Sequence, residues 1–139
     1  MKKIVLAPDS FKGTLSSRQV CEEIAKAAGR VFPGCQVKSV PVADGGEGSV
    51  EAFLTAMGGE RKELAVQGPF GEKMTGFYGL VEGGRTAIIE MAACAGLPLA
   101  EGRLDPERAT TYGVGQLMVD AARSGSKKII LGLGGSCTN

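Results

Sequence analysis

Three glycine-rich loops carry most of the side chains in this sequence that could do chemistry. Each follows a short apolar run, and together the loops cover residues 8–14, 44–49 and 134–139. Glycine lets backbone N–H groups approach an anion closely, and the start of a following helix adds partial positive charge. Carboxylates in such a loop repel phosphate unless a cation intervenes. Acidic glycine loops together with Lys12 therefore suggest a nucleotide bound with Mg²⁺.

Each loop also has a simpler, structural explanation. Asp9 and Ser10 could satisfy backbone groups at the end of a strand, and Asp44 and Glu47 could cap the helix that follows them. Residues 134–136 (Gly-Gly-Ser) could form only a tight turn between a strand and a helix. No single loop decides between a structural and a chemical role.

Any acid–base chemistry must use Asp, Glu, Lys or Tyr, because the sequence contains no histidine. Taken singly, Lys12 is typical of a solvated surface lysine, and Glu90, at the end of a predicted hairpin strand, is typical of a structural residue. No Gly-x-x-x-x-Gly-Lys-Ser/Thr pattern is present, and no Gly-x-Gly-x-x-Gly follows the first strand. Neither a Walker-A loop nor a Rossmann dinucleotide site is therefore predicted.

Apolar runs predict the strands that position these loops. The runs at 4–7 and 128–133 are short and uninterrupted, which is typical of fully buried strands, and 37–42 is a further strand. The middle of the chain has strands with no helix between them, which predicts an antiparallel hairpin region with strands at 64–66, 76–81 and 86–91.

Three helices are predicted between these strands. Ser16 followed by Gln19 is a capping box that begins the first helix. The second helix follows the acidic glycine loop and ends at Gly58. Residues 105–107 (Asp-Pro-Glu) have the form of a helix start, and one of the threonines at 110–111 could cap a second segment there.

The order of elements predicts an α/β fold with a mostly parallel sheet, flanked by helices and carrying an antiparallel hairpin insertion. We expect a parallel α/β core at 1–62 and 103–139, and an insertion at 63–102 that could belong to a second domain. A buried strand followed by a glycine loop normally leads into a covering helix. We therefore expect an incomplete amino-terminal portion, completed by the remainder of the same polypeptide or by a complementary fragment.

Composition excludes several function classes. The net charge is +1 with 43% hydrophobic residues, which gives no electrostatic reason to expect nucleic acid or a membrane surface as a partner. No apolar run approaches the roughly 20 residues of a membrane span, and the run after Lys3 is too short for a signal peptide. The four cysteines form no Cys-x-x-Cys unit, so we expect reduced thiols and a cytoplasmic location.

Four ordered motifs resemble those of the bacterial glycerate kinases, and the resemblance covers essentially the whole chain. They are 7–16 (Ala-Pro-Asp-Ser-Phe-Lys-Gly-Thr-Leu-Ser), 43–48 (Ala-Asp-Gly-Gly-Glu-Gly), 110–115 (Thr-Thr-Tyr-Gly-Val-Gly) and 132–139 (Gly-Leu-Gly-Gly-Ser-Cys-Thr-Asn). The sequence departs from the family by ending at Asn139 within the last motif, and by Cys137 where a small residue such as alanine is common.

The resemblance implies a kinase that transfers the γ-phosphoryl group of ATP, with Mg²⁺, to a hydroxyl of D-glycerate. It also implies a longer polypeptide with two α/β domains and an active site in the cleft between them. The product of such a kinase would be 2- or 3-phosphoglycerate. These 139 residues alone would then be inactive.

Mapped onto this sequence, the resemblance implies two catalytic residues, Lys12 and Asp44. Lys12 would neutralise charge in the transition state. Asp44 and Glu47 would hold Mg²⁺, or one of them would accept the hydroxyl proton. The resemblance also implies residues that bind substrate or phosphate through backbone and side-chain groups, with Glu47 among them. They are Asp9, Ser10, Gly45, Gly46, Glu47, Gly134, Gly135, Ser136, Thr138 and Asn139.

Two other functions stay open at this point. One is a kinase for another small hydroxy acid, and the other is a non-catalytic module that binds phosphate or a nucleotide. The sequence does not fix which hydroxyl accepts the phosphate, which nucleotide is preferred or which oligomer forms.

Overall fold

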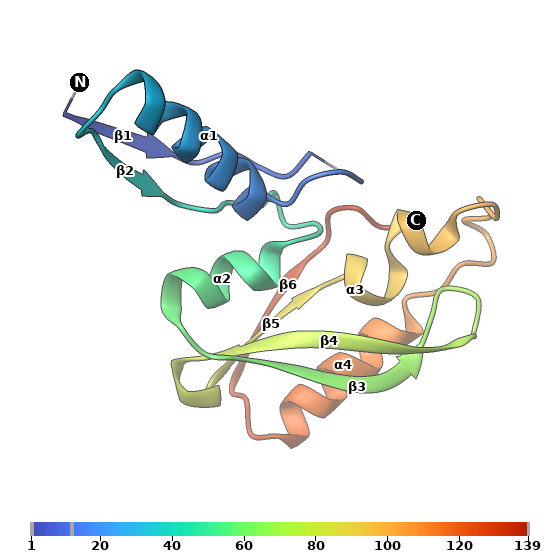
Figure 1. Ribbon diagram of the computed structural model, residues 1–139. Coiled ribbons are helices and arrows are strands. Elements are labelled where there is room, and N and C mark those ends of the chain that lie inside the picture. Colours follow the sequence, from blue (N-terminus) through green and yellow to red (C-terminus); the bar gives the residue numbers. More distant parts are fainter. Residues whose placement is uncertain (1, 12, 139) are drawn as a thin grey trace. The chain divides into compact units, whose positions relative to one another are not determined.

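A computed structural model describes residues 2–11 and 13–138 of the chain. The chain divides into two compact units, residues 1–43 and residues 44–139. Figure 1 shows both units.

The first unit is a helix packed on a pair of parallel strands. Strand β1 (Lys3–Leu6) pairs with β2 (Gln36–Ser39), and helix α1 (Ser17–Val31) connects them. The predicted capping box is confirmed, because Gln19 N–H donates to Ser16 Oγ at 3.3 Å and Ser16 N–H donates to Gln19 Oε1 at 2.9 Å. The helix therefore begins where the sequence predicts it.

The prediction that residues 4–7 form a fully buried strand is wrong for the described chain. Leu6 is buried, with the Cys21 thiol of α1 4.0 Å from its carbonyl oxygen. Val5, however, points the other way and is 59% exposed. Alternate side chains of a strand face opposite sides of its sheet, and α1 covers only one side of this two-stranded sheet.

The second unit is built on a four-stranded mixed sheet. The strand order is β3-β4-β5-β6, with antiparallel pairing of β3 with β4 and of β4 with β5, and parallel pairing of β5 with β6. The strands span Glu60–Gln67 (β3), Lys73–Val81 (β4), Thr86–Glu90 (β5) and Lys128–Gly132 (β6).

Helices cover both faces of this sheet (Figure 1). Helix α2 (Ser49–Met57) packs Val50 on one face against Val81 and Ile88. Helix α4 (Tyr112–Arg123) and the short helix α3 (Ala92–Ala95) pack on the other face, where Leu117 and Ile89 lie in the larger core. Because β4 and β5 alternate their side chains between the two faces, each strand contributes to both cores.

The predicted α/β class, with helices flanking sheets, is confirmed. The sheets are less parallel than expected, with two parallel and two antiparallel pairings among the described strands. The hairpin strands β3 and β4 are longer than predicted, and β6 is only half-buried rather than fully buried. The expected domain division at 1–62, 63–102 and 103–139 stays a prediction for a longer polypeptide.

The helix start predicted at residues 105–107 is wrong, and the alternative start directly after the threonines at 110–111 is confirmed. Residues 106–108 form a turn rather than a helix start, and α4 begins at Tyr112 with Thr111 in the cap position. The sequence reasoning also missed α3 and the 3₁₀ helix η2 (Leu97–Ala100) that follows it. Both are too short to show a helical period.

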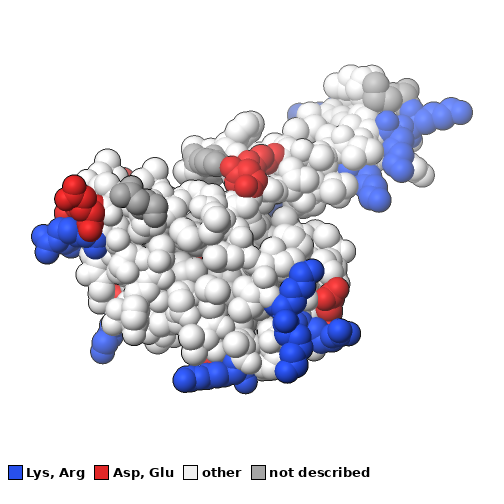
Figure 2. Space-filling model, turned by 180° about the vertical axis from the view of Figure 1, so that it is seen from behind, with Lys and Arg blue, Asp and Glu red and all other residues white. Residues whose placement is uncertain are grey.

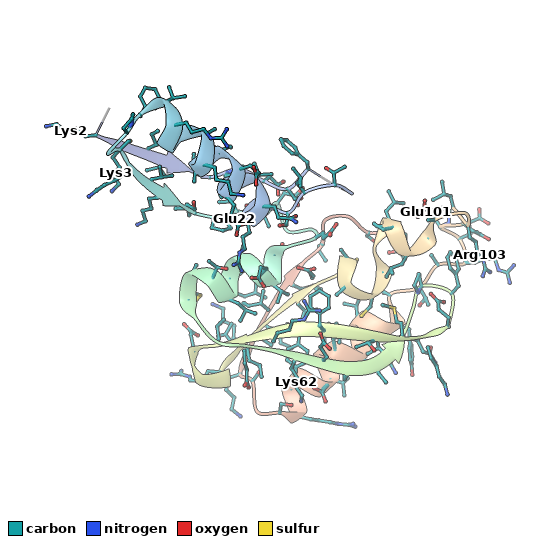
Figure 3. All side chains as sticks on the ribbon, in the orientation of Figure 1. Lys2, Lys3, Glu22, Lys62, Glu101 and Arg103 are labelled. Atoms are coloured by element: carbon teal, nitrogen blue, oxygen red, sulfur yellow. The ribbon has the colours of Figure 1, made fainter. Side chains whose placement is uncertain are left out.

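A polar network ties helix α4 to strands β3 and β4. The Asp120 Oδ2 atom accepts hydrogen bonds from Lys62 Nζ and from the Tyr78 hydroxyl, each at 2.7 Å. Lys62 Nζ also donates to Ser124 Oγ at 2.8 Å. Figure 3 shows Lys62 on β3 in this part of the unit.

Charged side chains stand in separated groups on the face shown in Figure 2. Within residues 2–11 and 13–138, no helix is both long enough and apolar enough to cross a membrane. All four cysteines are free thiols. Burial raises the pKa of the Cys94 thiol to about 11.

Candidate active site

Two of the three predicted loops meet in the second unit. The loop at 44–48 leads into α2, and the loop at 132–138 leaves the end of β6. Gly134 N–H donates to the Gly45 carbonyl oxygen at 2.9 Å. A Cβ atom on Gly132 would lie 2.4 Å from the same carbonyl oxygen, so the two backbones touch where only glycine fits.

The loop at 44–48 is held in shape by its own hydrogen bonds. Asp44 Oδ1 accepts from Gly46 N–H at 2.9 Å, and Ser49 Oγ donates to the Gly46 carbonyl at 2.8 Å. Gly46 and Ser49 are buried, whereas Asp44 and Glu47 are exposed. The buried residues thus form a scaffold, and the two carboxylates stand at the surface.

Helix α2 receives its N-terminal cap from a strand rather than from its own loop. Its N-cap residue, Gly48, has no side chain that could cap the helix. The carboxylate of Glu90, at the end of β5, accepts from Val50 N–H at 2.9 Å and from Gly48 N–H at 3.5 Å. These two amides therefore already have an anionic partner.

Glu90 is buried, with 2% of its surface exposed. Burial raises the pKa of its carboxyl above the ordinary value, and the hydrogen bonds from Val50 and Gly48 partly offset this rise. Sequence reasoning treated Glu90 as a structural residue and did not connect it with the acidic loop. Since about 40 residues separate the partners, no local pattern could have shown the contact.

The loop at 132–138 is fixed against α3 and η2. Leu97 N–H donates to the Gly135 carbonyl, and Cys137 N–H donates to the Ala95 carbonyl, each at 2.8 Å. The hydroxyls of Ser136 and Thr138 lie 2.7 Å apart, and Thr138 N–H donates to Ser136 Oγ at 3.0 Å. This loop therefore presents half-buried hydroxyl groups on a rigid backbone.

The third predicted loop lies in the first unit. Asp9 Oδ1 accepts from Ser10 N–H at 2.7 Å, and the Ser17 hydroxyl donates to the Pro8 carbonyl at 2.7 Å. Ser10 Oγ is buried and has no hydrogen-bond partner among the described residues. Lys12 and Asn139, two further predicted site residues, lie outside the described residues.

The structure thus brings together the predicted residues of two loops: Asp44, Gly45, Gly46, Glu47, Gly134, Gly135, Ser136 and Thr138. Asp9 and Ser10 belong to the other unit. In the described part of the chain, no cluster of three or more Cys, Asp or Glu side chains could hold a metal by itself. Mg²⁺ commonly takes only one or two carboxylates, with phosphate and water completing its shell, so Asp44 and Glu47 fit such an ion.

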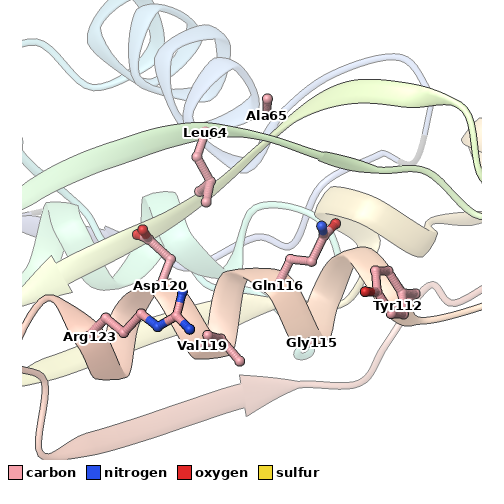
Figure 4. Close-up of a pocket in the computed structure, with 8 residues that line it drawn as sticks. All are labelled: Leu64, Ala65, Tyr112, Gly115, Gln116, Val119, Asp120 and Arg123. Atoms are coloured by element: carbon pink, nitrogen blue, oxygen red, sulfur yellow. The ribbon is translucent and has the colours of Figure 1, made fainter.

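A separate pocket of about 540 Å³ lies between β3 and α4 (Figure 4). Two of its polar side chains already have partners, since Gln116 Oε1 accepts from Gln67 N–H at 2.8 Å and Asp120 binds Lys62 and Tyr78. None of the predicted site residues that the structure describes lines it. The junction of the two loops is therefore the stronger candidate.

The architecture and its glycine loops define an α/β protein with polar groups gathered beyond the end of β6. Comparison with known proteins gives the family: the model of the "Glycerate kinase family" matches residues 4–139. The chain belongs to the glycerate kinase family.

Several relatives are similar along the whole chain. It is 50% identical over 139 residues to "Glycerate 2-kinase" of Escherichia coli K12 and 45% identical over 138 residues to "Glycerate kinase" of Bacillus subtilis 168. In both cases 99% of this chain and 36% of the relative are covered. The chain therefore spans little more than a third of the length of these relatives.

A crystal structure has the same fold. It is of a protein from Salmonella typhimurium LT2 assigned as a glycerate kinase 2, with 42% sequence identity and a TM-score of 0.77. The match covers 99% of this chain and 37% of that one.

Proposed function

We propose that this chain forms the amino-terminal part of a glycerate kinase, which transfers the γ-phosphoryl group of ATP to D-glycerate. The observation that carries the proposal is the contact between the acidic loop at 44–48 and the hydroxyl-bearing loop at 132–138. It occurs in a chain that the family model matches along residues 4–139. The remainder of the same polypeptide would complete the site, and the cytoplasm would be its location.

The transfer forms a P–O bond to a glycerate hydroxyl and breaks the bond between the γ-phosphorus and its bridging oxygen. The hydroxyl proton goes to a carboxylate, and Asp44 or Glu47 would accept it. The other of these two carboxylates would hold Mg²⁺, which neutralises phosphate charge when bound. Lys12 would place its ammonium group against the charge that develops on the phosphoryl oxygens.

The other loop residues would bind and orient the substrates. Ser10 is the best supported, because its buried hydroxyl has no partner among the described residues and such groups normally have one. Asp9 shapes the turn that carries Ser10 through its 2.7 Å hydrogen bond. One of the Ser136 and Thr138 hydroxyls donates to the other, so the remaining hydroxyl proton of this pair would be donated to glycerate or phosphate.

We propose the 2-hydroxyl of D-glycerate as the acceptor. The support is the relative from Escherichia coli K12, which is 50% identical and carries the name "Glycerate 2-kinase". The product would then be 2-phosphoglycerate with ADP.

Replacing Lys12 tests the catalytic role directly. In the full-length polypeptide, Lys12→Ala should lower kcat by at least about tenfold, which corresponds to about 1.4 kcal/mol of transition-state stabilisation. The matched control is Lys38→Ala, which removes an exposed lysine from the same unit and should leave kcat within about twofold. If Lys12→Ala lowered kcat by less than about tenfold, Lys12 would not be a catalytic residue.

A substrate panel separates the proposed activity from its alternatives. Full-length protein with ATP and Mg²⁺ should phosphorylate D-glycerate with a higher kcat/KM than L-glycerate, D-lactate or glycolate. If another acid gave a higher kcat/KM than D-glycerate, that acid would be the preferred substrate instead. Calorimetric binding of ATP without turnover on any acid would instead indicate a non-catalytic binding module.

A further inference from the structure

Glu90 occupies the position where the two site loops and a helix start converge. It is the last residue of β5, and its backbone is in register with Gly132 of β6. The next residue continues this contact, because Met91 N–H donates to the Gly132 carbonyl at 2.8 Å. The backbone at Glu90 is therefore tied to the loop at 132–138.

The side chain of Glu90 reaches the other loop. Its Oε2 atom accepts from Val50 N–H at 2.9 Å, and its Oε1 atom accepts from Gly48 N–H at 3.5 Å. Gly48 is the N-cap residue of α2 and directly follows Glu47, and Val50 lies in the first turn of the helix. One residue thus contacts the end of the acidic loop through its side chain and adjoins the glycine loop after β6 through its backbone.

Capping alone gives little reason for a carboxylate here. A buried carboxylate costs desolvation, and Ser, Thr or Asn can cap a helix with a neutral oxygen. Glu47 is close enough to add repulsion, and Arg61 is the cation that offsets part of it. Among the described residues, the hydrogen-bond partners of Glu90 are two backbone amides, and a buried carboxyl with a perturbed pKa is more typical of a functional site.

We propose that Glu90 is a positioning residue of the phosphoryl-transfer site, and that its carboxylate fixes the segment bearing Asp44 and Glu47 against the loop at 132–138. This inference rests on the proposed function. Glu90 itself contacts neither substrate nor phosphate; it acts through the amides of Gly48 and Val50. A consequence is that the N-terminus of α2 is already occupied by Glu90, so phosphate binds elsewhere in the site.

The test uses the full-length polypeptide with Glu90→Gln and Glu90→Asp. Glutamine keeps the size of the side chain but presents an NH₂ group to one of the two amides, so one hydrogen bond is lost. We expect kcat to fall at least tenfold, with KM for D-glycerate within about threefold and the folded state retained. Glu90→Asp keeps the charge and should recover part of the lost kcat.

The matched control is Glu51→Gln, which removes an exposed carboxylate from the first turn of the same helix. It should leave kcat within about twofold. Hydrogen exchange of the Val50 amide gives a second readout that needs no turnover, and it should be faster in Glu90→Gln than in the unchanged protein.

The outcomes are distinct. Unchanged kcat in a folded Glu90→Gln protein overturns the positioning role, and so does failure of both Glu90 variants to fold, since Glu90 would then serve the fold alone. If the unchanged protein does not phosphorylate glycerate, the proposed function fails. Faster Val50 exchange would then still support Glu90 as the residue that holds this loop, and unchanged exchange would overturn that part as well.

Discussion

At the scale of single residues, the candidate site depends on backbone contacts as much as on reactive side chains. The carbonyl of Gly45 accepts from Gly134 N–H and lies where a side chain on Gly132 would have to go. The exposed side chains of Asp44 and Glu47 therefore belong to a loop whose backbone is packed tightly against the loop at 132–138. The chemistry proposed for them requires that this junction keeps its geometry.

The Gly132→Ala variant should disrupt this junction. The added Cβ atom would lie 2.4 Å from the Gly45 carbonyl oxygen, which is backbone and cannot rotate away. We expect the free energy of unfolding to fall by about 1–3 kcal/mol, measured by chemical denaturation.

A second glycine gives the control for this prediction. Gly115 lies inside α4, and a Cβ atom there would meet nothing within 4 Å. Gly115→Ala should therefore stabilise the protein by roughly 0.5–1 kcal/mol through helix propensity. Equal effects of the two substitutions would show that the close approach at Gly132 does not matter.

At this scale the sequence motifs marked two loops that meet in the structure, but not the contacts between residues far apart in the chain. The motifs singled out Asp44, Gly45 and Gly134 because acidic glycine loops suit phosphate chemistry. The contact of Glu90 with Val50 was not predictable, because it joins residues about 40 positions apart and depends on the strand order. Local patterns carry no information on such pairs.

At the scale of elements, a shared polar network and close packing anchor α4 to the sheet. Asp120 of α4 binds Lys62 of β3 and Tyr78 of β4. The start of the helix is equally close, since a Cβ atom on Gly113 would lie 1.9 Å from the Gln67 carbonyl oxygen. Sequence patterns did not show why residue 113 must be glycine, because the requirement comes from strand β3, which packs against Gly113.

Removing the Asp120 carboxylate should give a pH-dependent loss of stability. The hydrogen bonds from Lys62 and then Tyr78 hold the pKa of Asp120 below its ordinary value. Its contribution is therefore fully present above the unfolded value of about 3.9 and is lost as pH falls through the lower folded value. Asp120→Asn should destabilise the protein at pH 7, and the difference should shrink below about pH 4.

Denaturation curves at several pH values check this prediction. Tyr78→Phe, which removes only the hydroxyl, should cost about 1 kcal/mol at pH 7. Glu107→Gln removes an exposed carboxylate and serves as the control. A difference between Asp120→Asn and the unchanged protein that stays constant down to pH 2 would contradict the assigned network.

Helix starts with local signals were predictable, and those without them were not. The capping box at Ser16 and Gln19 placed the start of α1, because both partners lie within one turn. Helix α3 was missed because four residues show no period. The burial of β1 was overestimated because an apolar run shows what a strand could bury but not whether a neighbour covers it.

At the scale of the whole molecule, the chain holds two compact α/β units and spans about 36% of its relatives' length. The first unit carries Asp9 and Ser10, and the second carries the junction of the other two loops. The four ordered motifs predicted the family, which the comparisons confirm. The proposed reaction is a property of the complete polypeptide.

The most direct measurement is ³¹P NMR of the full-length polypeptide mixed with ATP, Mg²⁺ and D-glycerate. The account predicts that the γ-phosphate signal of ATP disappears as signals of ADP and 2-phosphoglycerate grow in equal amounts. Formation of 3-phosphoglycerate would contradict the proposed acceptor hydroxyl. Release of inorganic phosphate alone, or an unchanged ATP spectrum, would contradict the proposed kinase.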